Sequence, residues 1–202
     1  MGMDFIKQEL ENIEFPIILV GHSIGSYMAI DIFRRSLEKV TYCIGLYPFL
    51  EINPESMMQP IIRKIAAIVE ILPSWALRMI VTNSLGKSWS AAALEATCSH
   101  LVQYHTIRNS LFMTMTEFLK LTETPDWAFM RANREKLAFL FGVDDHWAPL
   151  QMFEEISNQV PGIALSTESN HTHTFSCTEA GSSFVAKYVA SLIKNQLLCS
   201  RH

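Results

Sequence analysis

The sequence has few cysteines, no run of basic residues and no long apolar stretch. Its four cysteines stand far apart, at Cys43, Cys98, Cys177 and Cys199. This spacing indicates neither a zinc ribbon nor a redox dithiol, so free thiols in a reducing compartment are expected. The formal net charge is −4 and Lys and Arg are scattered, so no positive field gathers phosphates. Nucleic acid is therefore not an expected partner.

Segments that would cross a membrane or direct secretion are also missing. A spanning helix needs about 18 or more apolar residues, and the nearest candidate, 61–81, is interrupted by Arg63, Lys64, Glu70 and Pro73. The N-terminus has no apolar run after a positively charged start, as a secretory signal would. We expect a chain exposed to the cytosol, in which 61–81 at most lies on a lipid surface.

What is present predicts one α/β domain over residues 1–202. The chain is 49% hydrophobic and 18% charged, which suits one packed core. Residues 15–20 form an apolar, β-branched run typical of a buried parallel strand. A helix is expected from Ile24 to Arg35, and a second strand over 40–47 at the distance of a βαβ unit.

The rest of the chain predicts a helical cap followed by a return to the sheet. Residues 50–131 show helical periodicity broken by prolines and no strand pattern, so we interpret them as an inserted cap or lid. Strands are expected at 136–141 and 162–166, with a helix beginning near Pro149 between them. Residues 179–198 form an amphipathic closing helix. The expected architecture is the C-terminal half of a mostly parallel sheet.

The segment Gly21-His22-Ser23-Ile24-Gly25 fits the pattern G-x-S-x-G. In this motif the glycines allow a turn so sharp that the serine hydroxyl stands exposed between a strand and a helix. A strand is predicted directly before it and a helix directly after it, which is the context that the motif requires. Ser23 is therefore the candidate nucleophile, Ile24 N–H a candidate oxyanion donor, and His22 a support of the turn or a residue lining the pocket.

A serine nucleophile needs a histidine base, which in turn needs an acid that orients it. Asp145 follows the third predicted strand, and its neighbour Asp144 is the alternative, since only one of them can face the histidine. The histidine is His173 or His171 in the loop after the fourth strand, and spacing alone does not choose between them. Both loops leave the carboxyl ends of strands, where such sheets assemble their sites.

Two other interpretations compete with this one. His171 and His173, completed by His146 or His22, would form a zinc site, but no carboxylate or cysteine stands at ligand spacing, so neither a metal nor another cofactor is expected. The cap is expected to pack over the site. Shallow insertion of 61–81 at a lipid surface is compatible with that packing and is favoured by Trp75 and by nearby methionines and basic residues.

Several of these segments resemble the lipid droplet-associated hydrolases. The resemblance rests on G-H-S-I-G-S-Y, the following L-Y-P-F-L, the Pro- and Ile-rich cap, D-x-W-x-P at Asp145–Pro149 and H-x-F at His173–Phe175. It implies an α/β-hydrolase fold with a Ser-Asp-His triad, in which Asp145 and His173 match the family pattern. It also implies hydrolysis of sterol or acylglycerol esters at lipid droplets or the cytosolic face of the endoplasmic reticulum.

The chain departs from this resemblance at its N-terminus. Members of the fold carry several strands and an oxyanion loop before the nucleophile, whereas here the first strand is predicted at Phe15. We therefore expect a chain that lacks the second oxyanion donor, whose first strand is an apolar sheet edge. A catalytically weak protein that binds lipid droplets is the alternative to an esterase, and acyl transfer to an alcohol also stays open.

Overall fold

The computed structural model describes residues 15–51, 72–121, 123–145 and 147–199. The chain divides into two compact units. The first comprises Met1–Leu50, Pro125–His173 and Val185–His202, and the second comprises Glu51–Thr124 and Thr174–Phe184. The second unit differs from the expected cap, 50–131, at its C-terminal side, because residues 125–131 belong to the first unit.

The first unit is built on a four-stranded sheet in which all neighbours are parallel, in the order β1-β2-β3-β4. The strands are β1 (Ile17–His22), β2 (Val40–Leu46), β3 (Leu137–Gly142) and β4 (Ala164–Glu168). The helices that lie wholly in this unit are α2 (Ile24–Arg35), α7 (Trp127–Ala132), the 3₁₀ turn η2 (Arg134–Lys136) and α8 (Leu150–Gln159), and most of α9 (Glu179–Cys199) belongs to it as well. The predicted α/β class with a parallel sheet is thus confirmed.

Strands β1 and β4 each begin two residues later than predicted, for local reasons. Phe15 is 81% exposed and Pro16 has no N–H to donate, so pairing starts at Ile17, whose N–H donates to Lys39 O. Gly162 has a φ of 85°, the left-handed conformation of a turn rather than a strand. Strand β4 therefore starts at Ala164 and extends to Glu168.

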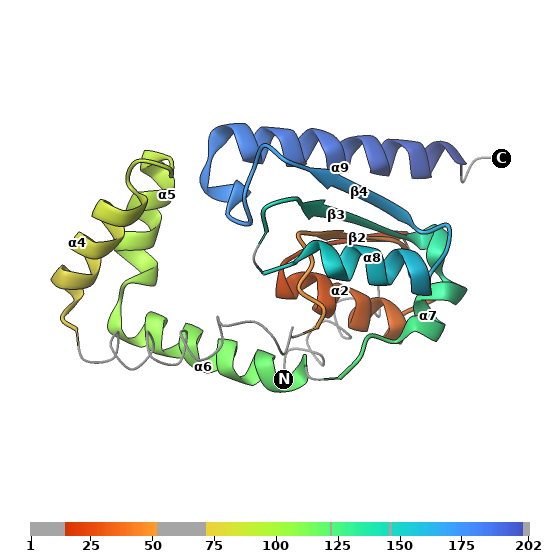
Figure 1. The fold of residues 1–202 in the computed structure, drawn as a ribbon, viewed down its shortest axis with the longest axis horizontal. Coiled ribbons are helices and arrows are strands. Elements are labelled where there is room, and N and C mark those ends of the chain that lie inside the picture. Colours follow the sequence, from red (N-terminus) through yellow and green to blue (C-terminus); the bar gives the residue numbers. More distant parts are fainter. Residues whose placement is uncertain (1–14, 52–71, 122, 146, 200–202) are drawn as a thin grey trace. The chain divides into compact units, whose positions relative to one another are not determined.

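Alternating strand residues cover the two faces of the sheet. Cys43, Leu137, Phe139 and Phe141 join residues of α2, α7 and α8 in one buried cluster. Burial raises the pKa of the Cys43 thiol to about 12, so it packs as a neutral side chain. Helix α9 (Glu179–Cys199) runs along the opposite side of the sheet from α2 and α8 (Figure 1). The inner strands β2 and β3 are almost wholly buried, as their apolar sequences indicate. Val20 on the edge strand β1 is 47% exposed.

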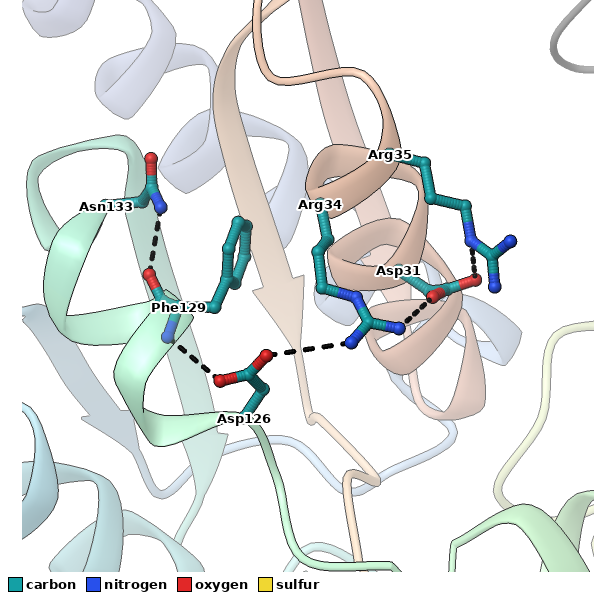
Figure 2. A network of polar contacts seen from close by, with 6 residues as sticks. All are labelled: Asp31, Arg34, Arg35, Asp126, Phe129 and Asn133. Carbon is teal, nitrogen blue, oxygen red and sulfur yellow. Dashed lines mark hydrogen bonds and ion pairs between the residues drawn. The ribbon is translucent and has the colours of Figure 1, made fainter.

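A polar network joins α2 to α7 where the chain returns to the sheet (Figure 2). The Asp126 carboxylate accepts the N–H of Phe129 at 3.0 Å and so caps α7. It also pairs with the Arg34 guanidinium at 3.6 Å, and Arg34 and Arg35 both bind Asp31. All of these ionic groups are partly exposed, so the cap contributes more to stability than the ion pairs.

The second unit is helical in its described part. Its helices are α4 (Ser74–Leu85), α5 (Ala91–Ala96), the π-helical turn η1 (Thr97–Leu101) and α6 (Tyr104–Lys120), and η3 (Phe175–Cys177) is a 3₁₀ turn. Pro73 precedes α4 in an extended conformation. Residues 52–71, which hold most of the apolar segment 61–81, lie outside the described residues. No helix in the described part is long and apolar enough to span a bilayer.

Candidate active site

Ser23 occupies the single residue between β1 and α2. Its backbone is in the left-handed region, with a φ of 56°, which is rare for a residue with a side chain. The conformation is held from both sides, because Ser23 N–H donates to Leu46 O at 3.0 Å and Ser23 O accepts the Phe49 N–H at 3.1 Å. Strand β2 and the residues directly after it thus hold the turn in a strained conformation, of a kind that is concentrated at active sites.

The two glycines of the motif differ in what they allow. A Cβ on Gly21 would lie 2.2 Å from Gly25 O and 2.6 Å from Ser26 N, so only glycine lets the first turn of α2 approach the strand. Ser26 Oγ adds a hydrogen bond to Gly21 O at 2.9 Å. A Cβ on Gly25 would meet no described atom within 4 Å. The close approach of α2 to the strand therefore depends on Gly21 rather than on Gly25.

Ser23, His173 and Asp145 lie together at the carboxyl ends of their strands. His173 Nδ1 is 2.7 Å from Asp145 Oδ2, and His173 Nε2 is 2.8 Å from Ser23 Oγ. Since a carboxylate only accepts, the proton lies on Nδ1, and the Nε2 lone pair faces the serine hydroxyl. The Asp145 side chain is fully buried, and its other oxygen accepts the Trp147 N–H at 2.8 Å. This geometry suits proton transfer from the serine.

The alternative candidates lie elsewhere. Asp144 is exposed, whereas Asp145 is buried. His171 donates its backbone N–H to Glu168, and the imidazole between Ser23 and Asp145 is that of His173. His146 lies outside the described residues. Among the described side chains, no three of the His, Cys, Asp and Glu type converge as metal ligands would.

His22 lies beside the histidine rather than beside the reacting atoms. Its Nε2–H donates to the carbonyl of His173 at 3.0 Å, and the two rings are 4.9 Å apart. Burial, followed by the repulsion that two protonated imidazoles would exert on each other, lowers the pKa of His22, whereas the hydrogen bond to the His173 carbonyl and the nearby Asp145 carboxylate oppose the shift. A neutral His22 therefore connects the turn at Ser23 to the loop that carries His173.

Several residues around the site had no role predicted from the sequence, although Tyr47, Phe49 and Trp147 lie within the motifs of the family resemblance. Phe49 and Trp147 meet edge to face at 6.2 Å, and the Trp147 ring lies 6.2 Å from that of His173. Tyr47 and Glu168 form a buried hydrogen bond. Both stand at the carboxyl ends of strands, where functional residues gather in such sheets. That position was the available signal.

Ile24 is the first residue of α2. A helix leaves its first N–H groups without an intrahelical acceptor. The Ile24 N–H is thus placed, next to Ser23, where an oxyanion donor is expected.

The fold is that of an α/β-hydrolase. The peroxisomal alpha-beta-hydrolase Lpx1 of Saccharomyces cerevisiae superposes with a TM-score of 0.68 at 12% identity, over 98% of this chain and 58% of that one. A structure from a study of carboxylesterases of Nitrososphaera gargenis gives a TM-score of 0.67 at 16% identity, over 96% and 72%. At these identities the likeness shows the fold alone.

The chain belongs to the lipid-droplet associated hydrolase family, whose model matches residues 2–176. The lipid droplet-associated hydrolase of Gallus gallus is 26% identical over 187 residues, which cover 86% of this chain and 57% of that protein. The chain spans somewhat more than half the length of the curated relatives it matches.

Proposed function

We propose that this chain hydrolyses carboxylic esters of lipids, with Ser23 as nucleophile, His173 as base and Asp145 as the acid that orients His173. The observation that carries the proposal is the imidazole held between a serine hydroxyl and a buried carboxylate. Family membership and the names of the relatives support a hydrolase at lipid droplets. Sterol and acylglycerol esters are the substrate classes that we propose.

The geometry supports a two-step reaction. His173 Nε2 takes the proton of Ser23 as Oγ bonds to the ester carbonyl carbon, and the Ile24 N–H stabilises the oxyanion. His173 then gives the proton to the departing alcohol, which leaves an acyl-serine. Water attacks this acyl group, its proton passes to His173, and the acid leaves as Ser23 Oγ–H is restored.

A fluorophosphonate probe tests the proposal, because it reacts only with an activated serine. We expect labelling of the wild-type chain and loss of labelling in Ser23→Ala and His173→Ala. Ser157→Ala on α8 is the matched control. Ser157 is exposed, and its substitution removes a hydroxyl of the same kind at a distance from the site. Absence of wild-type labelling in a folded sample, or equal labelling of Ser23→Ala, contradicts the proposal.

We also propose that the second unit contacts the lipid droplet, or the endoplasmic reticulum at its cytosolic face. Helix α4 carries exposed apolar side chains at Trp75 (69%), Met79 (55%) and Ile80 (47%), next to the exposed Arg78. Trp75 and Met79 are four residues apart and so share a face. Aromatic and apolar residues beside a basic one suit shallow insertion into a lipid surface.

Flotation with phospholipid-coated triacylglycerol droplets tests this surface. Wild-type protein should float with the droplets, and Trp75→Ala with Met79→Ala should remain largely in the soluble fraction. Ser84→Ala, at an exposed position on the other side of the same helix, serves as control. Equal flotation of all three proteins would exclude this face of α4, and failure of the wild type to float would exclude the lipid contact.

A further inference from the structure

A buried polar pair stands next to the proposed site and has no part in the proton transfer described above. Tyr47 is 0% exposed and Glu168 is 7% exposed. The Tyr47 hydroxyl donates a hydrogen bond to Glu168 Oε1. The two residues are 121 positions apart in the chain and follow or end different strands, β2 and β4.

The pair is made possible by a glycine between its two members. Strand β3 lies between β2 and β4 in the sheet and ends at Gly142. A Cβ on Gly142 would lie 2.5 Å from Tyr47 Cε1, so the tyrosine ring passes over the end of β3 where no side chain stands. Tyr47 itself has a φ of 46°, and its N–H donates to Leu140 O at 2.7 Å. The backbone of Tyr47 is therefore held against β3 in this unusual conformation.

The Glu168 carboxylate organises the loop that leaves β4. Its Oε2 accepts the Asn170 N–H at 2.9 Å, and its Oε1 accepts the His171 N–H at 3.1 Å as well as the Tyr47 hydroxyl. Hydrogen bonds to a carboxylate are stronger than those between neutral groups, the more so when buried. The loop is thereby fixed two residues before His173.

The tyrosine serves as a constant donor in this arrangement. Burial, the hydrogen bond to Glu168 and the charges of Glu168 and Asp145 all raise the pKa of Tyr47, so its hydroxyl stays protonated at neutral pH. Its ring also meets that of His173 nearly edge on, with centroids 6.1 Å apart. His22 holds the other end of the loop through the His173 carbonyl. His173 is thus contacted by Tyr47 and His22 in addition to Ser23 and Asp145.

We propose that Tyr47 and Glu168 are positioning residues that hold the loop 168–173 so that the His173 imidazole lies between Asp145 and Ser23. This inference rests on the proposed function and deepens it. Neither residue is proposed to touch the substrate. Their contribution is to keep the base in line with the serine before the reaction begins.

Glu168→Gln is the sharpest single change, because it keeps size and shape but replaces one acceptor oxygen by an NH₂ group. Whichever way the amide turns, one of the backbone N–H groups or the tyrosine hydroxyl then faces a donor. We expect kcat for a soluble ester to fall by about 100-fold, as for displacement of a reacting group by about 1 Å. KM should change little, since the substrate contacts are intact.

Tyr47→Phe is the second variant and removes only one hydroxyl, so it keeps the test available if Glu168→Gln unfolds. The two changes break one shared contact, so their effects on kcat should not add in the double variant. Glu154→Gln is the matched control, because Glu154 is exposed on α8. Its kcat should equal that of the wild type.

A spectroscopic readout separates this inference from the proposed function. The Nδ1–H proton of His173 should give a low-field NMR signal in ¹⁵N-histidine-labelled wild-type protein, and the signal should broaden or disappear in Glu168→Gln and Tyr47→Phe. Wild-type kcat and an unchanged signal in both folded variants would overturn the positioning role. If the wild type shows the signal but no fluorophosphonate labelling, the proposed function fails, and the signal in the variants still decides the positioning role.

Discussion

The protonation of His22, the residue before Ser23, should change the stability of the folded chain with pH. It is half-buried and donates to the His173 carbonyl, and burial is the largest cause of its lowered pKa. The unfolded chain takes up a proton on this imidazole near pH 6.5, whereas the folded chain does so at a lower pH. The folded chain therefore holds His22 neutral down to a lower pH than the unfolded chain does.

The free energy of unfolding should fall as the pH falls below about 6.5, because the unfolded state then binds more protons. His22→Gln keeps an N–H donor without an ionisable group, so we expect this variant to lose less stability between pH 7.5 and 5.5 than the wild type. Urea unfolding at both pH values measures the difference. An identical pH dependence in the two proteins would show that His22 does not titrate differently on folding.

At the scale of elements, the strand–turn–helix around Ser23 depends on the missing Cβ of Gly21. Gly21→Ala should lower the free energy of unfolding by about 1–3 kcal/mol, because its Cβ would meet the backbone of Gly25 and Ser26. Gly25→Ala should leave stability unchanged or raise it by up to about 1 kcal/mol, since alanine favours the helix. Thermal unfolding and fluorophosphonate labelling compare the two. Wild-type stability of Gly21→Ala would contradict the close packing.

At the start of α7, Asp126 both caps the helix and pairs with Arg34, so the two contributions to stability can be compared. Asp126→Ala removes both the acceptor for Phe129 N–H and the charge that faces Arg34, and should cost about 1 kcal/mol. Asp126→Asn keeps the cap and loses only the exposed ion pair, which contributes about 0–1 kcal/mol. We expect the asparagine variant to be the more stable one in urea unfolding. The reverse order would mean that the ion pair outweighs the cap.

The sequence predicts those elements whose signals are local. Strand β2 and helices α2 and α9 lie within a residue of their expected bounds, because apolar period and flanking breakers specify them. Ser23, Asp145 and His173 were expected together and lie together, while their catalytic role stays a prediction. The pair Tyr47–Glu168 could not be predicted, because it depends on sheet order and on the space over Gly142, which no local pattern encodes.

At the scale of the whole molecule, the two proposed tasks fall on different units. The residues proposed for the chemistry belong to the first unit, and the exposed apolar face of α4 belongs to the second. If hydrolysis depends on Ser23 and binding to the lipid surface depends on α4, substitutions should affect the two activities separately. A soluble ester reports on the first task alone, whereas an emulsified ester requires both.

Trp75→Ala with Met79→Ala should therefore leave kcat/KM for a soluble short-chain ester within twofold of the wild type. On emulsified triacylglycerol or sterol ester the same variant should lose activity, because the side chains that would enter the lipid are gone. Losing about 1–2 kcal/mol of surface binding corresponds to roughly 5- to 30-fold less enzyme on the droplet at low protein concentration. Ser23→Ala should abolish both activities, and Ser84→Ala, on the other side of α4, should change neither. Equal losses on soluble and emulsified substrates would mean that α4 acts on the chemistry itself, because a surface contact has no effect where there is no surface.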